Sequence, residues 1–230
     1  MISGEAFAKG EAGELVAGMV IRFGPGVHHL DERAFRGADG DSLPADITVI
    51  GAGMDATLLA LGDISIDSVV ERLAFRNMTL DCENNGLFDL RNESMLLDLE
   101  RVRIVRFDAG HGGCKIFGVT RGSVLRARDC QIVGGYGRSP GNGDIFRRGP
   151  VIARFENCHF ELVDDWPRLK NSRIHYKGCT FALLRKNPAD YPVDGELYEN
   201  CSFSDPLGSP AAEARMNKKL SDLFWQFEGK

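Results

Sequence analysis

Apolar and polar positions alternate in six short segments along the chain. Each segment begins with a turn-type residue, continues with an apolar or Cys residue and then a polar residue, and ends with an apolar residue. The six copies are residues 77–80, 101–104, 129–132, 157–160, 178–181 and 200–203. They recur at intervals of roughly 20 to 30 residues, which is typical of one stacked structural unit and too short for a domain. The alternation predicts a half-buried β-strand in each copy.

Further apolar runs occupy each period. One run comes just before a copy, at 64–66, 95–99, 124–127, 151–155 and 173–176, and another lies earlier, at 57–61, 87–90, 116–119 and 145–147. We call the strand of the repeated pattern the first strand, and the second and third strands follow it around the coil. Three short strands per period, with no helical segment between them, predict an all-β solenoid of about six coils, a parallel β-helix. Parallel crossovers are nearly always right-handed, so we expect a right-handed coil.

Turn-forming residues mark the expected corners of the coil. The residue before the inward apolar or Cys position is Asn, Asp or Gly in five of the six copies, and these residues tolerate the left-handed backbone region. A second column is expected where the second strand bends into the third. Its members are Gly62, Asn92, Gly122, Gly149 and Asn171.

The segment 47–59 carries a family resemblance. Its sequence, Ile-Thr-Val-Ile-Gly-Ala-Gly-Met-Asp-Ala-Thr-Leu-Leu, places a strand, a Gly-x-Gly turn and a Thr-Leu pair in succession. In this it resembles the first coil of the pectin-lyase-like right-handed parallel β-helices, and the resemblance extends over residues 18–207. The family includes lyases, hydrolases, esterases and proteins that only bind or hold shape, so the resemblance implies the fold and no single activity.

The 230 residues, 43% of them hydrophobic, are expected to form one domain with a continuous core. We divide it into a cap with lead-in strands (1–46), the β-helix (47–207) and an amphipathic helix (208–230). Residues 4–17 are expected to form a short helix over the first coil, because a solenoid needs capped ends. In the C-terminal helix Leu223, Phe224 and Phe227 can share one face. This helix is either a lid on the last coil or a docking helix for a homo-oligomer.

Four cysteines, Cys130, Cys158, Cys179 and Cys201, occupy the inward position of the repeat, which predicts buried, reduced thiols. No cysteine pair has the spacing of a zinc site, so neither a metal nor another cofactor is expected.

The sequence also limits the expected partners and compartment. A formal net charge of -5 gives no electrostatic reason to expect nucleic acid. No run of about 20 apolar residues is present, so we expect no membrane partner. The N-terminus shows no basic stretch followed by an apolar core. These features predict a cytoplasmic protein, or an excised domain of a larger or exported one.

The polar residues of the repeat are expected to point outward and form a wall on the first-strand face. Arg103, Gln131 and His159 would lie on successive coils, with Glu161 one outward step beyond His159. Arg103, His159 and Glu161 are the candidate catalytic residues, because a guanidinium, an imidazole and a carboxylate can bind an anionic sugar or transfer protons. Gln131 is a candidate ligand-binding residue. A polar outer face required only for solubility explains the same pattern.

Loops after the first strand carry further candidate ligand-binding side chains, since loops on a rigid scaffold often bind ligands. These are Asp108, His111, Tyr136, Asp164, Asp165 and Trp166. The Gly-His-Gly at 110–112 and the Asp pair at 164–165 resemble elements of polygalacturonases. Their order is reversed here, and the Arg-Ile-Lys of that family is Arg-Ile-His at 173–175. The catalytic residues of that family therefore do not carry over.

Two functions are compatible with these features. The first is a non-catalytic β-helix module that binds carbohydrate or protein, or serves as a structural scaffold. The second is a polysaccharide lyase or glycoside hydrolase that acts on an acidic polysaccharide at the first-strand face. Enzymes of this fold usually have more coils than the six or so expected here, which favours the first function.

Overall fold

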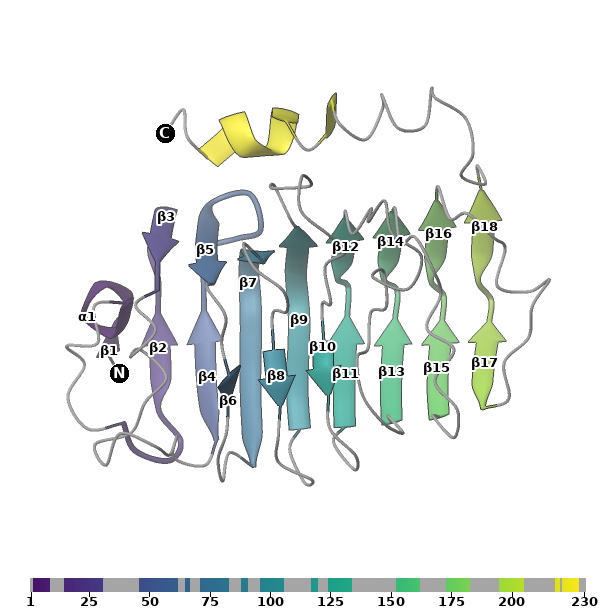
Figure 1. Cartoon of the computed structure of the whole chain (residues 1–230), viewed down its shortest axis with the longest axis horizontal. Helices are drawn as coiled ribbons and strands as arrows, with labels where there is room; N and C mark the ends of the chain where they lie inside the picture. Colours follow the sequence, from purple (N-terminus) through teal and green to yellow (C-terminus); the bar gives the residue numbers. More distant parts are fainter. Residues whose placement is uncertain are drawn as a thin grey trace.

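The computed structural model describes the strands of the coil and parts of both ends. The described residues are 2–8, 15–30, 46–61, 65–66, 71–82, 88–90, 96–105, 117–119, 124–133, 152–161, 173–182, 195–204, 218–219 and 221–227. The chain forms a parallel β-solenoid, with the strands stacked side by side along one axis (Figure 1). This confirms the predicted all-β solenoid class.

The longest ladder is formed by the third strands of the coil, and we call it the third-strand sheet. Its nine strands pair in parallel in the order β1-β2-β4-β7-β9-β11-β13-β15-β17. Their bounds are β1 (Ile2–Ser3), β2 (Val20–Arg22), β4 (Ile47–Ile50), β7 (Arg72–Cys82), β9 (Leu96–Val105), β11 (Val124–Arg128), β13 (Ile152–Glu156), β15 (Arg173–Lys177) and β17 (Glu196–Glu199). The lead-in strands near the N-terminus thus continue the same sheet.

The repeated pattern forms a second ladder, which we call the first-strand sheet. It contains β3 (Gly26–His29), β5 (Thr57–Leu61), the second halves of β7 and β9, β12 (Gln131–Val133), β14 (His159–Glu161), β16 (Thr180–Ala182) and β18 (Ser202–Ser204). The second strands form a separate sheet of β6 (Ser65–Ile66), β8 (Phe88–Leu90) and β10 (Phe117–Val119). Within the described residues, three coils therefore have all three sides, fewer than the six predicted. The hand of the coil stays a prediction.

Two strand assignments made from the sequence are wrong. The run 57–61 was expected among the second strands, but β5 pairs with the second half of β7, in the first-strand sheet. The run 64–66 was expected among the third strands, but β6 pairs with β8, in the second-strand sheet. Both are short apolar runs, and their alternation does not distinguish one side of the coil from another.

A column of left-handed corners separates the third-strand sheet from the first-strand sheet. The residues directly before the inward positions have φ between 52° and 62°. They are Asn77, Arg101, Asp129, Asn157, Gly178 and Asn200. The predicted corner at this position is confirmed, and it is also formed by Arg101, whose side chain gives no special tolerance of positive φ. The other predicted column, from Gly62 to Asn171, lies outside the described residues.

The Gly-x-Gly segment packs closely against the next coil. A Cβ on Gly51 would lie 2.5 Å from the carbonyl oxygen of Asn77, so only glycine fits there. The buried Thr57 hydroxyl donates to Gly24 O and accepts from Ala52 N, at 2.8 and 2.9 Å. One side chain thus connects segments of successive coils.

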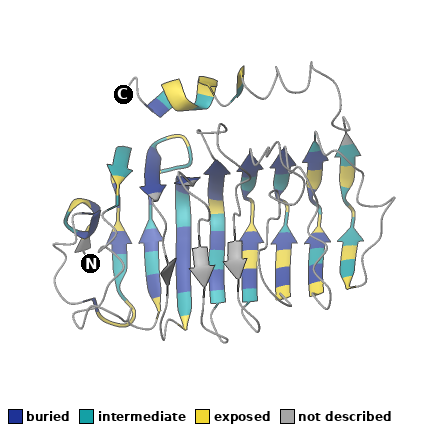
Figure 2. Ribbon diagram, viewed as in Figure 1, coloured by how far each residue is buried: buried dark blue, intermediate teal, exposed yellow. Residues whose placement is uncertain are grey.

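In-register stacking of identical positions builds the core. Phe155, Tyr176 and Tyr198 stack with ring centroids 5.2 and 4.9 Å apart. A second stack of Phe160, Phe181 and Phe203 has spacings of 4.8 and 4.9 Å. These spacings match the separation of neighbouring strands, so each ring rests on its equivalent in the next coil. Figure 2 shows the resulting line of buried positions along the ladder.

The four inward cysteines are free thiols, as predicted. Cys130, Cys158 and Cys179 are buried, whereas Cys201, in the last coil, is partly exposed. Hydrogen bonding to the neighbouring thiols of Cys130 and Cys179, together with burial, raises the pKa of Cys158. The Cys158 thiol is therefore expected to react slowly, because the thiolate is the reactive form.

The N-terminal end is covered by a shorter helix than predicted. Helix α1 (Gly4–Ala8) places Phe7 against Phe23, edge to face, with centroids 6.2 Å apart. Leu15 is buried, but Val16 is exposed and not helical, so a continuous helix over 4–17 is wrong. Neither α1 nor the described C-terminal helical segment is long and apolar enough to span a membrane.

The C-terminal helix lies in a different place from the predicted lid. Residues 218–219 and 221–227 are helical, and the helix lies along the side of the coil, directed toward its N-terminal end (Figure 1). Gln226 Nε2 donates to Asp55 O, just before β5, at 3.5 Å. Phe227 is buried, while Phe224 and Trp225 are exposed. The helix therefore covers the first-strand sheet rather than the last coil, and Phe224 does not share the buried face with Phe227.

Candidate functional site

The predicted catalytic residues lie on the outer face of the first-strand sheet, which we call the first-strand wall. Strand pairing places Arg103 (β9), Gln131 (β12) and His159 (β14) at matching positions on successive coils. Thr79 precedes them and Thr180 follows them in the same row. The alternation of the repeat thus brings together the residues expected from the sequence.

Arg103 is held within the wall by neighbouring coils. Its Nη2 forms an ion pair with Asp55 Oδ1 at 2.8 Å, and its Nε donates to Gln131 Oε1 at 2.9 Å. Only 9% of its side chain is exposed. The charge that was expected to bind an anionic ligand is therefore balanced by a carboxylate of the protein.

His159 bridges two polar neighbours. Its Nδ1 lies 2.6 Å from Thr180 Oγ1, and its Nε2 lies 3.3 Å from Glu161 Oε2. The neutral tautomer with the proton on Nε2 satisfies both contacts, since Nε2 donates to the carboxylate and Nδ1 accepts from the hydroxyl. Glu161 and His159 thus form a hydrogen-bonded pair, whereas Arg103 is paired elsewhere.

The C-terminal helix supplies a second partner for Glu161. Lys219 Nζ forms an ion pair and hydrogen bond with Glu161 Oε2. The hydrogen bond from His159 lowers the pKa of Glu161, burial of the carboxylate opposes this, and Lys219 lowers it further, to about 2. Glu161 is therefore ionised at neutral pH. Only 9% of its side chain is exposed.

Burial extends to several other residues of the wall, whereas Thr180 is exposed and 38% of the His159 side chain is exposed. Val105 and Val133 occupy outward positions beside Glu161, yet 1% and 2% of their surfaces are exposed. Thr79 is fully buried and donates to Met54 O at 2.7 Å. The expected solvated wall is therefore wrong for Thr79, Arg103 and Glu161, whereas Thr180 and Ser202 are exposed as expected. Sequence alternation predicts which way a strand residue points, but it cannot show that a distant helix returns to this face.

The remaining predicted ligand-binding residues have no described placement. Asp108, His111, Tyr136, Asp164, Asp165 and Trp166 all lie outside the described residues. Within the described part of the chain, no three His, Cys, Asp or Glu side chains gather as a metal site.

The outer face of the third-strand sheet was not predicted as a site, although it carries the more accessible charges. We call the outward positions of β11, β13 and β15 the basic face. They are Val124, Arg126, Arg128, Ile152, Arg154, Glu156, Arg173, His175 and Lys177. Five Arg or Lys side chains thus accompany one carboxylate, in a chain whose net charge is -5.

A signal for the basic face was present in the sequence. Arg126 and Arg154 are separated by the same interval as Cys130 and Cys158, so they occupy equivalent positions on successive coils. The basic face can be found from the sequence if the outward positions of the third strands are aligned by the interval of the repeat, as was done for the first strands.

Comparison of the chain with protein-family models, with curated proteins and with solved structures finds no significant match.

Proposed function

We propose that this chain is a non-catalytic β-solenoid module that binds a partner through an outer face of the coil, or holds other domains in position. The observation that carries this proposal is the state of Glu161. Its carboxylate is paired with His159 and Lys219, largely buried, and has a pKa of about 2. A general acid must carry a proton, and a general base works best with a pKa near the working pH. Glu161 meets neither requirement.

The position of Arg103 supports the same conclusion. Its guanidinium is paired with Asp55 and Gln131 and is largely withdrawn from solvent. An approaching uronate would have to displace a carboxylate already in place. A guanidinium that is paired with the protein's own residues on Nη2 and Nε is typical of a structural role, although its buried Nη1 has no hydrogen-bond partner among the described residues.

The alternative function, a polysaccharide lyase or glycoside hydrolase, is favoured by one contact. His159 lies between Thr180 and Glu161, an arrangement that can pass a proton. In this alternative the C-terminal helix would have to move away from Glu161 before an acidic polysaccharide could reach it.

We extend the proposal to the family and the compartment. The left-handed corners and three parallel ladders support placing the coil with the pectin-lyase-like folds. The four free thiols suit a reducing compartment such as the cytoplasm. Exposed Phe224 and Trp225, which pack edge to face at 5.6 Å, support a homo-oligomer contact through the outward side of the C-terminal helix.

The test is a cleavage assay on polygalacturonate and alginate that measures new reducing ends and unsaturated uronates. We expect no turnover by the purified full chain or by Lys219→Ala, which removes the helix partner of Glu161. His175→Ala is the matched control for His159→Ala, because His175 contacts Glu199 at a similar distance on the other sheet. Cleavage that is abolished by His159→Ala or Glu161→Gln, and retained by His175→Ala, would establish the enzyme instead.

A further inference from the structure

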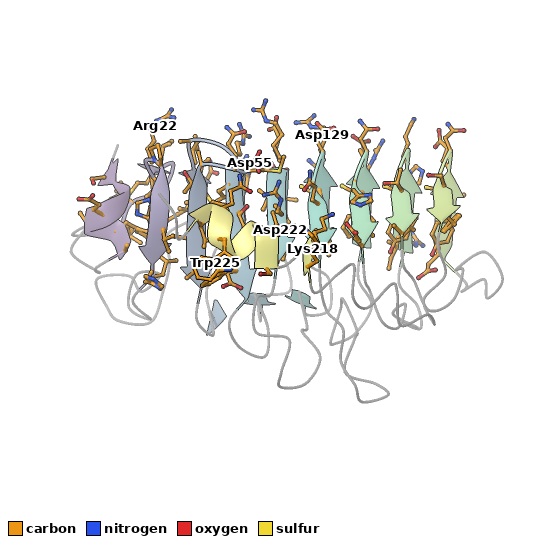
Figure 3. The ribbon with its side chains drawn as sticks, turned by 90° about the horizontal axis from the view of Figure 1, so that it is seen from above. Arg22, Asp55, Asp129, Lys218, Asp222 and Trp225 are labelled. Atoms are coloured by element: carbon orange, nitrogen blue, oxygen red, sulfur yellow. The ribbon has the colours of Figure 1, made fainter. Side chains whose placement is uncertain are left out.

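The basic face is open to solvent over three neighbouring coils. Along β13 the exposed Ile152 and Arg154 alternate with the buried Ala153 and Phe155, and β11 and β15 show the same alternation. About half of the Ile152 surface is exposed, at 49%. Figure 3 shows side chains, Arg22 among them, that project from the outer side of the coil. The face therefore presents side chains to solvent rather than to the rest of the chain.

Ion pairs leave part of the positive charge unbalanced. Arg128 pairs with Glu100 at 3.3 Å, and Lys177 pairs with Glu199 at 3.2 Å, so these cations are neutralised along the lateral borders of the face. Arg154 pairs with Glu156 at 2.6 Å. Arg126 and Arg173 have no ion-pair partner within the described part of the chain. Counted over the described residues alone, the nine positions of the basic face thus keep a net positive charge.

Strand register arranges the face in two parallel rows. Arg126 and Arg154 occupy matching positions on β11 and β13 and form a row along the solenoid axis, which His175 continues on β15 beside Glu199. Val124, Ile152 and Arg173 form the neighbouring row, which is apolar over its first two members. Neighbouring strands are about 4.8 Å apart, so each row spans roughly 10 Å.

We propose that the basic face binds an extended, acidic segment of a partner protein that also carries apolar side chains. This inference rests on the proposed binding function and names its partner. An extended peptide places successive side chains on opposite sides. A segment lying along the seam between the two rows directs its carboxylates to Arg126 and Arg154 and its apolar side chains to Val124 and Ile152. Arg154 is paired with Glu156, but 55% of its side chain is exposed, against 9% for Arg103, so a second carboxylate can reach its guanidinium from solvent.

The chemistry of the face favours a peptide over other anions. The nine outward positions include no Phe, Tyr or Trp ring on which a base or a sugar could stack. Carboxylates of Asp98 and Glu100 on one side and Glu199 on the other restrict the basic area to three coils. A nucleic-acid duplex carries one charge per ~1.7 Å over a long axis and would meet these carboxylates. A purely charged polymer has no apolar group that could pack on the exposed Ile152.

The experiment uses the full chain and a fluorescent peptide of about eight residues in which Glu and Val alternate. Fluorescence anisotropy at low salt measures the dissociation constant. We expect Arg126→Glu and Arg154→Glu each to weaken binding by about tenfold or more, because each places a repelling charge in the row. Arg22→Glu is the matched control, since Arg22 is an exposed arginine of the same sheet on β2. It should change binding less than about twofold.

A second arm tests the apolar half of the proposal. Ile152→Ser should weaken binding of the Glu-Val peptide and leave binding of a Glu-Ser peptide unchanged, because only the former has side chains to pack on Ile152. Circular dichroism verifies that each variant is folded. The proposal is overturned if the wild type does not bind the Glu-Val peptide, or if Arg126→Glu and Arg22→Glu have equal effects. It is also overturned if heparin or duplex DNA binds more tightly than the peptide with no contribution from Ile152.

The outcomes separate this inference from the proposed function. If the peptide does not bind and no polysaccharide is cleaved, the chain remains a binding or scaffold module, and its contact face lies elsewhere. If a polysaccharide is cleaved, the proposal of a non-catalytic module is overturned, whether or not the peptide binds.

Discussion

Two outer faces of one solenoid differ in how far their charged side chains are buried. On the first-strand wall, Glu161 and Arg103 are largely buried, and each is paired with a residue from another part of the chain. On the basic face, Arg126 and Arg154 stand in solvent, and Ile152 is half exposed beside them. The strands have the same geometry on both faces. The C-terminal helix lies over the first-strand wall, where Lys219 pairs with Glu161.

This comparison shows why polar residues on a solenoid cannot be interpreted by type alone. An Arg, a His and a Glu in neighbouring positions suggest a catalytic site, but on the first-strand wall the Arg is paired with Asp55 and Gln131, and the Glu is paired with the His and with Lys219 of the helix. Simple arginines on the other face remain available for a partner. Burial and pairing, rather than residue identity, separate the two roles.

The largest expected effect comes from a matched pair of charge insertions. Val133 and Ile152 are both outward aliphatic residues, with 2% and 49% of their surfaces exposed. Val133→Asp buries a charge without a partner and should lower the free energy of unfolding by about 3 kcal/mol or more. Ile152→Asp should stay within about 0.5 kcal/mol of the wild type. Urea unfolding measures both, and equal losses would show that the two faces do not differ in burial.

A smaller effect is expected from the two His–Glu pairs. Glu161→Gln removes the charge held by His159 and Lys219 and should lower the free energy of unfolding by about 1 to 3 kcal/mol at neutral pH. Glu199→Gln is the control. The hydrogen bond from Lys177 lowers the pKa of Glu199, but this carboxylate is exposed, so little stability should be lost.

The pH dependence of the same pair gives a further check. The pKa of Glu161 in the folded state, about 2, is below its ordinary value of 4.5. Its ion pair therefore stabilises the fold above pH 4.5, and this contribution is lost as the pH falls toward 2. The difference in stability between the wild type and Glu161→Gln should shrink over that range. A difference that stays constant from pH 7 to pH 2 would contradict the pairing.

Much of the fold was predictable because each coil repeats the same turn residue followed by alternating apolar and polar residues. The alternation around Cys130, Cys158 and Cys179 predicted the inward column and the strands of the first ladder. The turn residues before these cysteines predicted the left-handed corner. Both features are local, and strand period and corner residues determine them without reference to the rest of the chain.

The failures of prediction all involve contacts distant in sequence. The runs 57–61 and 64–66 look alike, and only their pairing with β7 and β8 shows which side of the coil they occupy. The buried state of Glu161 depends on Lys219, which is 58 residues away. No pattern within the repeat contains that information. The amphipathic character of the C-terminal segment predicted a packed helix but not the surface that it covers.

Hydroxyl-radical footprinting tests the difference between the two faces most directly. The modification rates of Val105 and Val133 on the first-strand wall are compared with those of Ile152 and Leu197 on the third-strand sheet, each divided by the rate in the unfolded chain. Because 1% and 2% of the first pair are exposed, against 49% and 57% of the second pair, we expect the valines to be protected and the other two to be modified freely. Equal protection of all four side chains would contradict the account.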